Sequence, residues 1–563
     1  MARRSWCNSL LGRAAMWHAG RIARRFFHAA EHATATQDEL LSRLIARNAD
    51  SGFGRDHYFH RIRTYDDFAA NVPIRSYDDM APYINRVRNG DVGALFGGPQ
   101  TILMFALTSG TTAEPKYIPV TRDVLAEWRR GWNVWGFKAL LDHPACVVRH
   151  IVQVTSPMED HLAPSGAPCG AITGLLATTQ KKLVRRFYTS PLAVAGITDS
   201  AAKYYTIMRM AIPKDVAWLV TANPSTLLVL ARTADEHREQ MIRDIHDGAL
   251  RADMPVESAV RAALAPTLKP DSACASRLER IVREHGTLYP KHYWDVGFLA
   301  HWTGGTMGLY LPQFPKYFGD VPARDIGLIA SEGRMSVPME DGTPGGILAI
   351  TGQFFEFVPA EEYGTPNPTV LRSDEVEEGR EYFLLLTNAS GLYRYDVGDR
   401  VRVTGRAGQA PVIEFLSRDA HTSSMAGEKL TEDQVVAAMR RACEAADGAA
   451  GGAVVDFVLA PRWAEVPRYR LYVERESAQR VDHLAPKLDK ALSEISLEYA
   501  SKRKTLRLEG VELAELPPGC LADRDCKLRE QRSRTSEQFK HQYLLSKPGM
   551  DADLERRSVP HAH

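Results

Sequence analysis

Residues 102–116 read ILMFALTSGTTAEPK, and this stretch decides how the first part of the chain is organised. The apolar run from Ile102 to Leu107 is typical of a buried strand, and it passes directly into small hydroxyl residues around Gly110. In such a turn, successive backbone N–H groups and hydroxyls converge on one anion, and the glycine allows a close approach. Lys116 then adds a positive charge. We therefore predict an anion-binding turn, with a plain Ser/Thr-rich hairpin turn as the alternative.

On both sides of this stretch, strand-like runs alternate with helical patterns over about 400 residues, which predicts an α/β architecture. The expected helices are 36–50, 125–141 and 225–251, and the expected strands are 147–154, 216–220, 326–330 and 346–350.

The pattern of expected strands and helices changes near residue 418. Three short strand candidates joined by turn residues precede this point and predict an antiparallel meander, at 382–387, 392–395 and 400–405. A helix, two extended segments and a second helix follow, at 431–446, 454–459, 468–473 and 482–500. We therefore expect a large domain (1–417), a small α+β domain (418–547) and a polar tail (548–563) that is disordered.

The composition is that of an ordinary globular protein. Of 563 residues, 44% are hydrophobic and 25% charged, and the net charge is +1. This excludes wholesale disorder, and it argues against a field that draws the whole protein to nucleic acid or a membrane. No run approaches the roughly 18 apolar residues of a membrane span. The seven cysteines contain no C-x-x-C pair, which argues against a zinc site and a disulfide framework and favours the cytoplasm.

The N-terminal segment contains six arginines and no acid before Glu31, interleaved with Trp17, Phe26 and Phe27. We favour a first helix that packs its aromatic stripe on the body of the protein. An organelle-targeting peptide is the alternative.

Two further motifs each carry one acidic residue. Residues 326–333 (IGLIASEG) predict a buried strand with Glu332 at its end, where one carboxylate suits Mg²⁺ but is also commonly just solvated. Residues 391–399 (GLYRYDVGD) place Asp399 in a predicted tight turn. There its carboxylate can accept hydrogen bonds from vicinal hydroxyls, or simply bond its own backbone.

These three motifs, in this order, resemble those of adenylate-forming enzymes. The segment YRYDVGD (393–399) is similar to the Tyr-Arg-Tyr-Arg-Val-Gly-Asp of the Gretchen Hagen-type (auxin-responsive) acyl acid amido synthetases, with Asp396 as the one mismatch. Residues 73–79 (PIRSYDD), 116–121 (KYIPVT) and 302–305 (WTGG) also look like that family. The resemblance runs from about residue 36 to residue 545.

The resemblance implies a large α/β domain with mixed sheets of the adenylate-forming type and a small, mobile α+β domain. It implies a ligase that uses ATP and Mg²⁺ to adenylate a small carboxylic acid and then transfers the acyl group to an amine, an amino acid in this family. Transfer to coenzyme A, or a non-catalytic module that binds nucleotide or acyl ligand, are the alternatives. The protein would be a monomer or a homodimer, with its acyl pocket near 169–178 and 204–210.

The resemblance also assigns roles to single residues. Glu332 would hold Mg²⁺, Asp399 the ribose hydroxyls, and Arg418 would mark the hinge between the domains. Lys429 and Lys540 would be catalytic lysines of the small domain, although His541-Gln542-Tyr543 replaces the family's Val-Pro-Arg after Lys540. The residues expected around the phosphates and adenine are Thr108, Ser109, Gly110, Thr111, Thr112, Lys116, Ala330 and Ser331.

Overall fold

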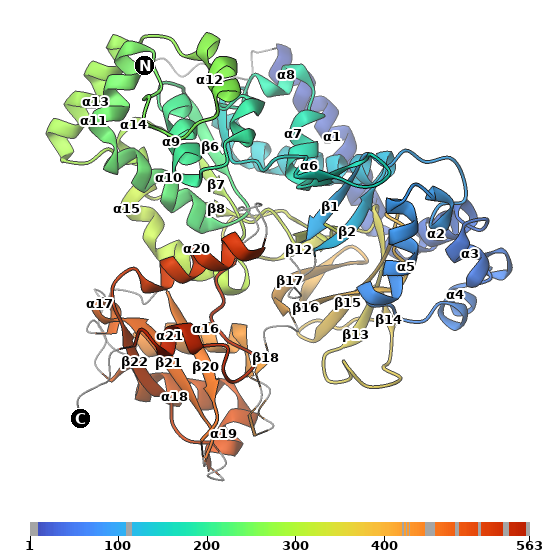
Figure 1. Ribbon diagram of the computed structural model, residues 1–563. Coiled ribbons are helices and arrows are strands. Elements are labelled where there is room, and N and C mark those ends of the chain that lie inside the picture. The colour runs from blue at the N-terminus through green and yellow to red at the C-terminus, as the bar shows by residue number, and fades with distance from the viewer. Residues whose placement is uncertain are drawn as a thin grey trace.

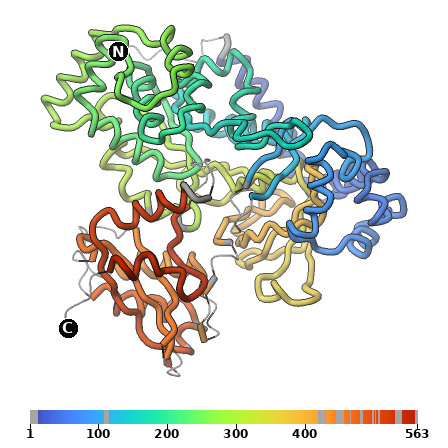
Figure 2. The backbone as a smooth tube through the Cα atoms, in the orientation of Figure 1, coloured from blue at the N-terminus to red at the C-terminus, as the bar shows by residue number. Residues whose placement is uncertain are grey.

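The computed structural model describes residues 10–108, 115–418, 422–423, 425–426, 428, 430–444, 456–464, 466–478, 483–504, 508–532 and 540–558. Residues up to 418 form a large body, and the described residues from 422 onward form a smaller one at the lower left of Figure 1. The backbone tube shows the red C-terminal part of the chain in the smaller body (Figure 2).

The N-terminal part of the large body combines helices with a four-stranded mixed sheet. Capping boxes start two of the helices, because Thr64 and Ser76 each exchange hydrogen bonds with an aspartate three residues later. The sheet has the order β2-β1-β5-β4, in which β1 pairs antiparallel with β2 and parallel with β5. These elements are α1 (Leu10–Glu31), α2 (Ala33–Arg47), α3 (Gly52–Asp56), α4 (Tyr65–Asn71), α5 (Tyr77–Arg88), β1 (Met104–Thr108), β2 (Lys116–Val120), β4 (His161–Leu162), β5 (Pro168–Gly170), α7 (Ile172–Thr178) and α8 (Lys182–Arg185).

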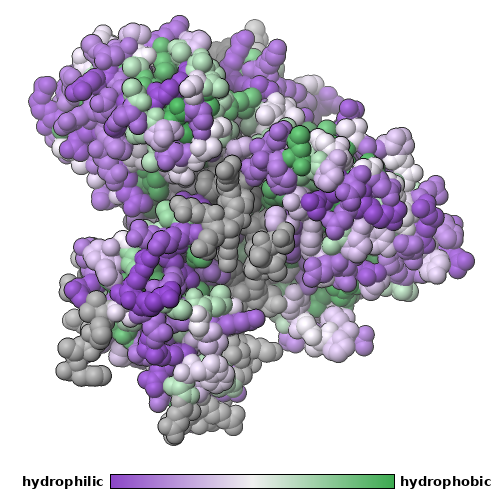
Figure 3. Space-filling model, in the orientation of Figure 1, coloured by the Kyte–Doolittle hydropathy of each residue, from purple (hydrophilic) through white to green (hydrophobic). Residues whose placement is uncertain are grey.

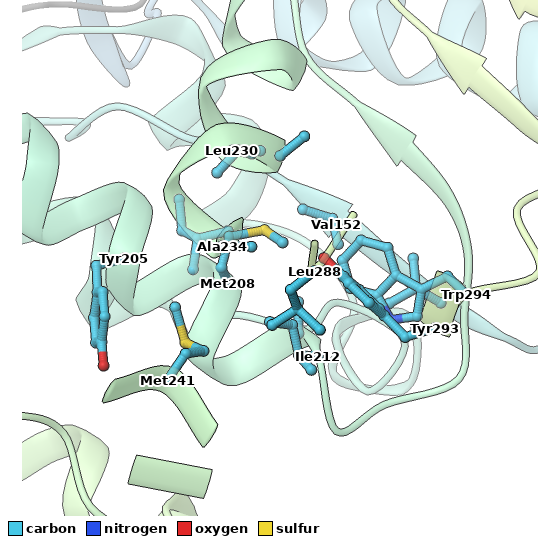
Figure 4. Packing of buried hydrophobic residues seen from close by; sticks show 14 of the residues in the cluster. Val152, Tyr205, Met208, Ile212, Leu230, Ala234, Met241, Leu288, Tyr293 and Trp294 are labelled. Atoms are coloured by element: carbon cyan, nitrogen blue, oxygen red, sulfur yellow. The ribbon is translucent and has the colours of Figure 1, made fainter. Parts of the chain in front are cut away.

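A parallel sheet of order β3-β6-β7-β8 forms the second layer. Its helices pack an apolar core that includes Met208, Leu230 and Met241 (Figure 4). The single helix predicted over 225–251 is two helices, because the chain turns at His237 and both segments can then face this core. The elements are β3 (His150–Gln153), α9 (Ser200–Ala211), β6 (Val216–Val220), α10 (Pro224–Glu236), α11 (Arg238–Asp247), α12 (Ser258–Leu264), α13 (Ser272–His285), α14 (Pro290–Tyr293), β7 (Phe298–Ala300), α15 (Phe314–Phe318) and β8 (Ala323–Arg324).

An antiparallel sheet of seven strands, in the order β11-β12-β17-β16-β15-β13-β14, completes the large body. The predicted meander is present, but its second and third strands are wrong. One long strand, β16, replaces them, and Arg394 (φ +46°) and Gly391 (φ +79°) bend the chain before it begins. The strands are β11 (Ser336–Pro338), β12 (Gly346–Leu348), β13 (Gln353–Pro359), β14 (Leu371–Arg372), β15 (Glu381–Asn388), β16 (Tyr395–Ala407) and β17 (Ala410–Arg418).

Helix α6 (Arg122–Asp142) packs between the parallel sheet and the seven-stranded sheet. Its Trp135 donates a hydrogen bond from Nε1 to the carbonyl of Asp325 (2.7 Å) and belongs to the same apolar cluster as strands of both sheets. Helix α1 lies against α6 and buries Phe26 in that cluster, so the predicted first helix is confirmed, although Trp17 remains exposed. No helix in the described part of the chain has the length and apolar character needed to cross a bilayer. The face in Figure 3 is mostly hydrophilic over α11 and α13.

The smaller body has two apolar clusters of its own, and their buried members all lie at residue 430 or later. A disordered tail was expected after residue 547, but α21 forms there because Leu554 is buried and Asp551 accepts a hydrogen bond from Tyr472. The elements are β18 (Thr422–Ser423), β19 (Leu430–Thr431), α16 (Glu432–Glu444), β20 (Phe457–Arg462), β21 (Arg468–Glu474), α17 (Arg475–Ala478), α18 (Leu484–Ile495), α19 (Leu497–Lys504), β22 (Glu512–Leu516), α20 (Cys520–Arg532) and α21 (Ala552–Glu555).

Candidate active site

Strands β1 and β2 form the hairpin that carries the predicted anion-binding turn. Thr108, whose side chain is not described, pairs with Lys116 at the open end of the ladder. The Lys116 ammonium lies 5.4 Å from the ring centroid of Tyr77. The turn residues Ser109, Gly110, Thr111 and Thr112 lie outside the described residues, so their predicted contacts with phosphate stay a prediction.

A small hairpin brings Glu332 next to the end of β1. Strands β9 (Ile329–Ala330) and β10 (Gly333–Arg334) pair antiparallel, with Ser331 and Glu332 as the turn between them. The hydroxyl of Ser331 donates to the carbonyl of Leu107 (3.0 Å), which ties this turn to β1. The turn is also fixed from the other side, because Asn388 donates from Nδ2 to the carbonyl of Glu332 (2.8 Å).

The strand predicted over 326–330 is therefore wrong in length. Only Ile329 and Ala330 form β9, because Gly327 adopts a φ of +94° that interrupts an extended chain. Glu332 lies in the turn and is buried, so its expected position after a strand end is correct even though the strand is short.

Asp399 lies within β16 and not in a tight turn between two strands as predicted. Its register partner is Arg418, the last residue of β17, whose side chain is not described. The turn-like pattern in the sequence has a local cause: Gly398 has a φ of +71° and donates from its N–H to Asp396 (2.8 Å) inside the strand. Asp399 is fully buried and lines a cleft between the two bodies.

Lys540 reaches the same cleft from the smaller body. Its ammonium lies 4.7 Å from the ring centroid of Trp302 and 5.5 Å from that of Phe415. Trp302 is held by a hydrogen bond from its indole N–H to the carbonyl of Gly327 (2.9 Å). Cation–π contact of this kind favours a lysine in this position. The cleft is small, about 50 Å³, and Ile329 of the hairpin also lines it.

His541 anchors the segment that carries Lys540. Its two ring nitrogens face acceptors, the carboxylate of Asp525 at 2.7 Å and the carbonyl of Phe457 at 2.8 Å. Burial alone would lower the pKa of His541, but the hydrogen bond and charge of Asp525 and the Phe457 carbonyl raise it above its ordinary value. A protonated His541 donates to both acceptors.

Asp325 supports the floor of the cleft from the end of β8. Its carboxylate accepts hydrogen bonds from the Thr303 N–H (2.6 Å), the Thr303 hydroxyl (2.8 Å) and the Gly327 N–H (2.6 Å). Burial raises the pKa of Asp325 to about 6, against the opposing effect of these donors. The three bonds fix the loop that carries Trp302.

A larger cavity of about 410 Å³ is also lined by residues of the β9–β10 hairpin. Glu332 and Arg334 line it, together with Gln353. Much of the rest of its wall comes from α1 and α6. The apolar lining residues are Ile22, Phe26, Val124, Trp128, Val134, Val337 and Ala349, and the further polar ones are His18, Arg25, Glu127, Arg130, Thr351, Asn388 and Ser390. A cavity of this size and character fits a small organic ligand.

The segments predicted to form the acyl pocket, 169–178 and 204–210, do not line this cavity. Cys169, Ile207 and Met208 belong to the apolar cores, and an acyl pocket in these segments stays a prediction. Lys429 lies outside the described residues, so its role stays a prediction.

Further residues of the two cavities were not singled out as site residues from the sequence, among them Trp302, Phe415 and Arg334. Trp302 falls in the stretch 302–305 that resembles the family, which was a usable signal. Nothing in the sequence around Arg334 marks it, because its surroundings come from α6 and from the segment before β9.

Comparison with known proteins gives one family across the chain. The GH3 family N-terminal domain matches residues 22–323, the GH3 family central domain matches 346–418, and the GH3 family C-terminal domain matches 433–549. The chain is 28% identical over 429 residues to the indole-3-acetic acid-amido synthetase GH3.8 of Oryza sativa subsp. indica, covering 72% of this chain and 70% of that protein.

It is 24% identical over 426 residues to the jasmonoyl–L-amino acid synthetase JAR4 of Nicotiana attenuata, covering 72% of this chain and 73% of that protein. Among solved structures, the GH3.15 acyl acid amido synthetase superposes with a TM-score of 0.81 at 21% identity, over 95% of both chains. That likeness shows a shared fold.

Proposed function

The chain belongs to the GH3 family, and we propose that it is an ATP-dependent acyl acid amido synthetase that joins a small carboxylic acid to an amino acid. Relatives that match most of its length are amido synthetases of this kind.

One observation carries the proposal: the β9–β10 hairpin contributes residues to two cavities of different size. Ile329 lines the cleft that holds Asp399 and Lys540, while Glu332 and Arg334 line the larger cavity. A ligase that activates a carboxylic acid needs a site for the nucleotide beside a site for the acid. The turn at Ser331 and Glu332 is the point at which the two substrates would meet.

We assign the nucleotide to the cleft. Asp399 would accept hydrogen bonds from the ribose hydroxyls, and Lys540 would balance the charge that develops on the α-phosphate. The turn after β1 would hold phosphate oxygens, since Ser331 ties β1 to the hairpin. The cleft is too small for a nucleotide while Lys540 lies on Trp302, so ATP entry requires the smaller body to move, with Arg418 at the hinge.

The residues present fit a magnesium ion that is shared with the nucleotide. In the described part of the chain no group of three His, Cys, Asp or Glu side chains gathers to hold a metal, and Glu332 offers one buried carboxylate at the meeting point. Mg²⁺ commonly binds through one or two carboxylates and substrate phosphates. When bound, it would offset negative charge on the phosphate oxygens.

The reaction then has two steps. A carboxylate oxygen of the acid bonds to the α-phosphorus of ATP as the bond to the β-phosphate oxygen breaks, giving an acyl adenylate and pyrophosphate. The amine nitrogen next bonds to the acyl carbon as the bond between that carbon and the AMP oxygen breaks, giving an amide, AMP and a proton. The larger cavity would bind the body of the acid and exclude water from the acyl adenylate.

Location and assembly remain proposals. The six cysteines in the described part of the chain form no disulfide, which fits the cytoplasm. We expect a monomer or a homodimer, with no nucleic-acid or membrane partner.

The test is a screen of pyrophosphate release over aryl and alkyl acids with ATP and Mg²⁺, repeated with each amino acid and with coenzyme A. We expect pyrophosphate with some acids, and AMP together with an amide once the right amino acid is present. Turnover that depends on coenzyme A instead would contradict the amide assignment. ATP binding without pyrophosphate from any acid would contradict enzyme function altogether.

A further inference from the structure

Arg334 is a buried cation with donors that the protein leaves unused. Only 4% of its surface is exposed, and Nη1 donates to the carbonyls of Ile326 (2.8 Å) and Ser336 (3.2 Å). The guanidinium carbon lies 4.4 Å from the ring centroid of Trp132 on α6. The other two nitrogens, Nε and Nη2, are buried and have no hydrogen-bond partner within the described residues.

Acids near Arg334 compensate its charge only in part, because the charge of Asp325 raises the pKa of Arg334 but no carboxylate of the described residues accepts a hydrogen bond from it. The carboxylate of Asp325 is already engaged by Thr303 and Gly327, and Glu127 pairs with Arg130. Burial lowers the pKa of Arg334 to about 9, so the guanidinium is still protonated at neutral pH. An unpaired buried donor costs about 1–3 kcal/mol, and more when it is charged. A fold retains such a residue more readily when a ligand satisfies it.

The position of Arg334 says where that ligand group lies. Arg334 lines the larger cavity two residues beyond Glu332, about 6–7 Å further along the hairpin. An acid whose reacting carboxyl group is at Glu332 therefore extends its body past Arg334. His18, Arg25 and Arg130 also line the cavity, but Arg334 is the lining cation whose buried nitrogens lack a partner within the described residues.

We propose that the cavity takes acyl acids that carry a second oxygen acceptor, a carboxylate or a carbonyl, and that Arg334 is the specificity-determining residue that binds it. This inference rests on the proposed function, since it takes the cavity to be the acyl site. Arg334 holds the acceptor through Nη2, while Nη1 and Trp132 fix the plane of the guanidinium. The second acceptor thus distinguishes the preferred acids from plain aryl and alkyl acids of similar size.

The experiment compares matched acids that differ in one group: 3-phenylpropionate with 3-(4-carboxyphenyl)propionate, and hexanoate with hexanedioate. The kcat/KM of pyrophosphate release is measured for the wild type, Arg334→Met and Arg334→Lys. We expect the wild type to prefer the acids with the second acceptor at least tenfold. Arg334→Met should lower kcat/KM for these acids about 100-fold and leave the plain acids within threefold. Arg334→Lys should fall between them.

A buried arginine elsewhere provides the control for folding. Arg209 on α9 is equally buried, donates to the carbonyls of Ala249 and Asp244, and does not line the cavity. Arg209→Met should reduce stability without changing the preference between matched acids.

The outcomes distinguish failure of the Arg334 assignment from failure of the proposed amido synthetase function. No pyrophosphate from the wild type with any acid overturns the proposed function and this inference with it. Pyrophosphate with no preference for the second acceptor overturns the inference alone, even if the variants fail to fold. An equal loss for both acids in Arg334→Met also overturns it, because Arg334 would then bind the reacting carboxylate.

Discussion

Two glycines of α6 offer a matched pair of substitutions that tests how tightly Arg334 is held. Gly131 and Gly136 lie five residues apart in the same helix. A Cβ added at Gly131 would lie 2.3 Å from Cδ and 2.7 Å from Nε of Arg334, whereas one added at Gly136 would have no heavy atom within 4 Å. The same change, Gly→Ala, therefore meets a buried side chain at one position and open space at the other.

The magnitude follows from this geometry. A normal carbon–carbon contact is about 3.5 Å, so Arg334 would have to move by about 1.2 Å. It cannot do so cheaply, because its guanidinium is bonded to two carbonyls and stacked on Trp132. Overpacking of this kind costs about 1–3 kcal/mol. Alanine in place of glycine within a helix gains up to about 1 kcal/mol, which is the whole effect at Gly136.

We expect Gly131→Ala to lower the free energy of unfolding by about 1–2 kcal/mol and Gly136→Ala to raise it by up to about 1 kcal/mol. The assay is equilibrium urea unfolding followed by tryptophan fluorescence, with the slope compared between variants. Gly131→Ala should also reduce the preference for acids with a second acceptor, and Gly136→Ala should not. Equal shifts in the same direction for the two variants would show that Arg334 is free to move and would refute the reasoning.

Three further predictions concern the cleft and the hairpin. Lys540→Met should slow pyrophosphate release about 10²- to 10³-fold, as expected for loss of a charge worth about 3–4 kcal/mol. The control is Lys547→Met, which replaces an exposed lysine of the same segment and should leave the rate unchanged. Equal rates for the two variants would contradict the role of Lys540. Chelation of Mg²⁺ should abolish pyrophosphate release. Glu332→Gln should raise the Mg²⁺ concentration needed for the half-maximal rate at least tenfold. An unchanged half-maximal Mg²⁺ concentration would exclude Glu332 as a ligand. His541→Asn should destabilise the protein by about 2 kcal/mol at pH 6. Because folding raises the pKa of His541, this stabilisation is present below about pH 6.5 and is lost as the pH rises through the folded-state pKa. The free energies of unfolding of the variant and the wild type, measured in urea, should therefore converge at alkaline pH. A difference that widens with pH would contradict a protonated His541.

Much of the fold could be predicted because local patterns determine it. The buried strand Val216–Val220 has the predicted bounds, and helix α6 agrees within a few residues, since each has an unbroken apolar pattern between clear boundaries. The interruptions were not predictable in this way. Gly327 and Gly398 adopt positive φ values within segments that otherwise have strand-like sequences, so one predicted strand is shortened and one predicted turn lies inside a strand.

The sequence motifs singled out one residue at the larger cavity and one at the cleft, but not the rest of either lining. Glu332 and Asp399 lie in short segments whose residue types suggest their chemistry, and the structure places each at one of two adjoining cavities. The larger cavity depends on α1, α6 and the β9–β10 hairpin coming together across more than 300 residues, which no local pattern encodes. The same holds for the contact of Lys540 with Trp302, which joins the two bodies.

The tail shows the limit of composition as a guide. Residues after 547 are polar and lack periodicity, yet Leu554 is buried against the smaller body. Asp551 accepts a hydrogen bond from Tyr472 (2.8 Å), which fixes the start of α21. A four-residue helix held by one apolar side chain and one hydrogen bond leaves almost no periodic signal in the sequence.

The most direct test of the central claim follows oxygen atoms through one turnover. The acid that gives the fastest pyrophosphate release is labelled with ¹⁸O in its carboxyl group and incubated with ATP, Mg²⁺ and the matching amino acid. If the acid attacks the α-phosphorus at the hairpin between the two cavities, each AMP formed carries one ¹⁸O atom in its phosphate. AMP without label, or label found in inorganic phosphate beside ADP, would contradict the acyl adenylate and the proposed function with it.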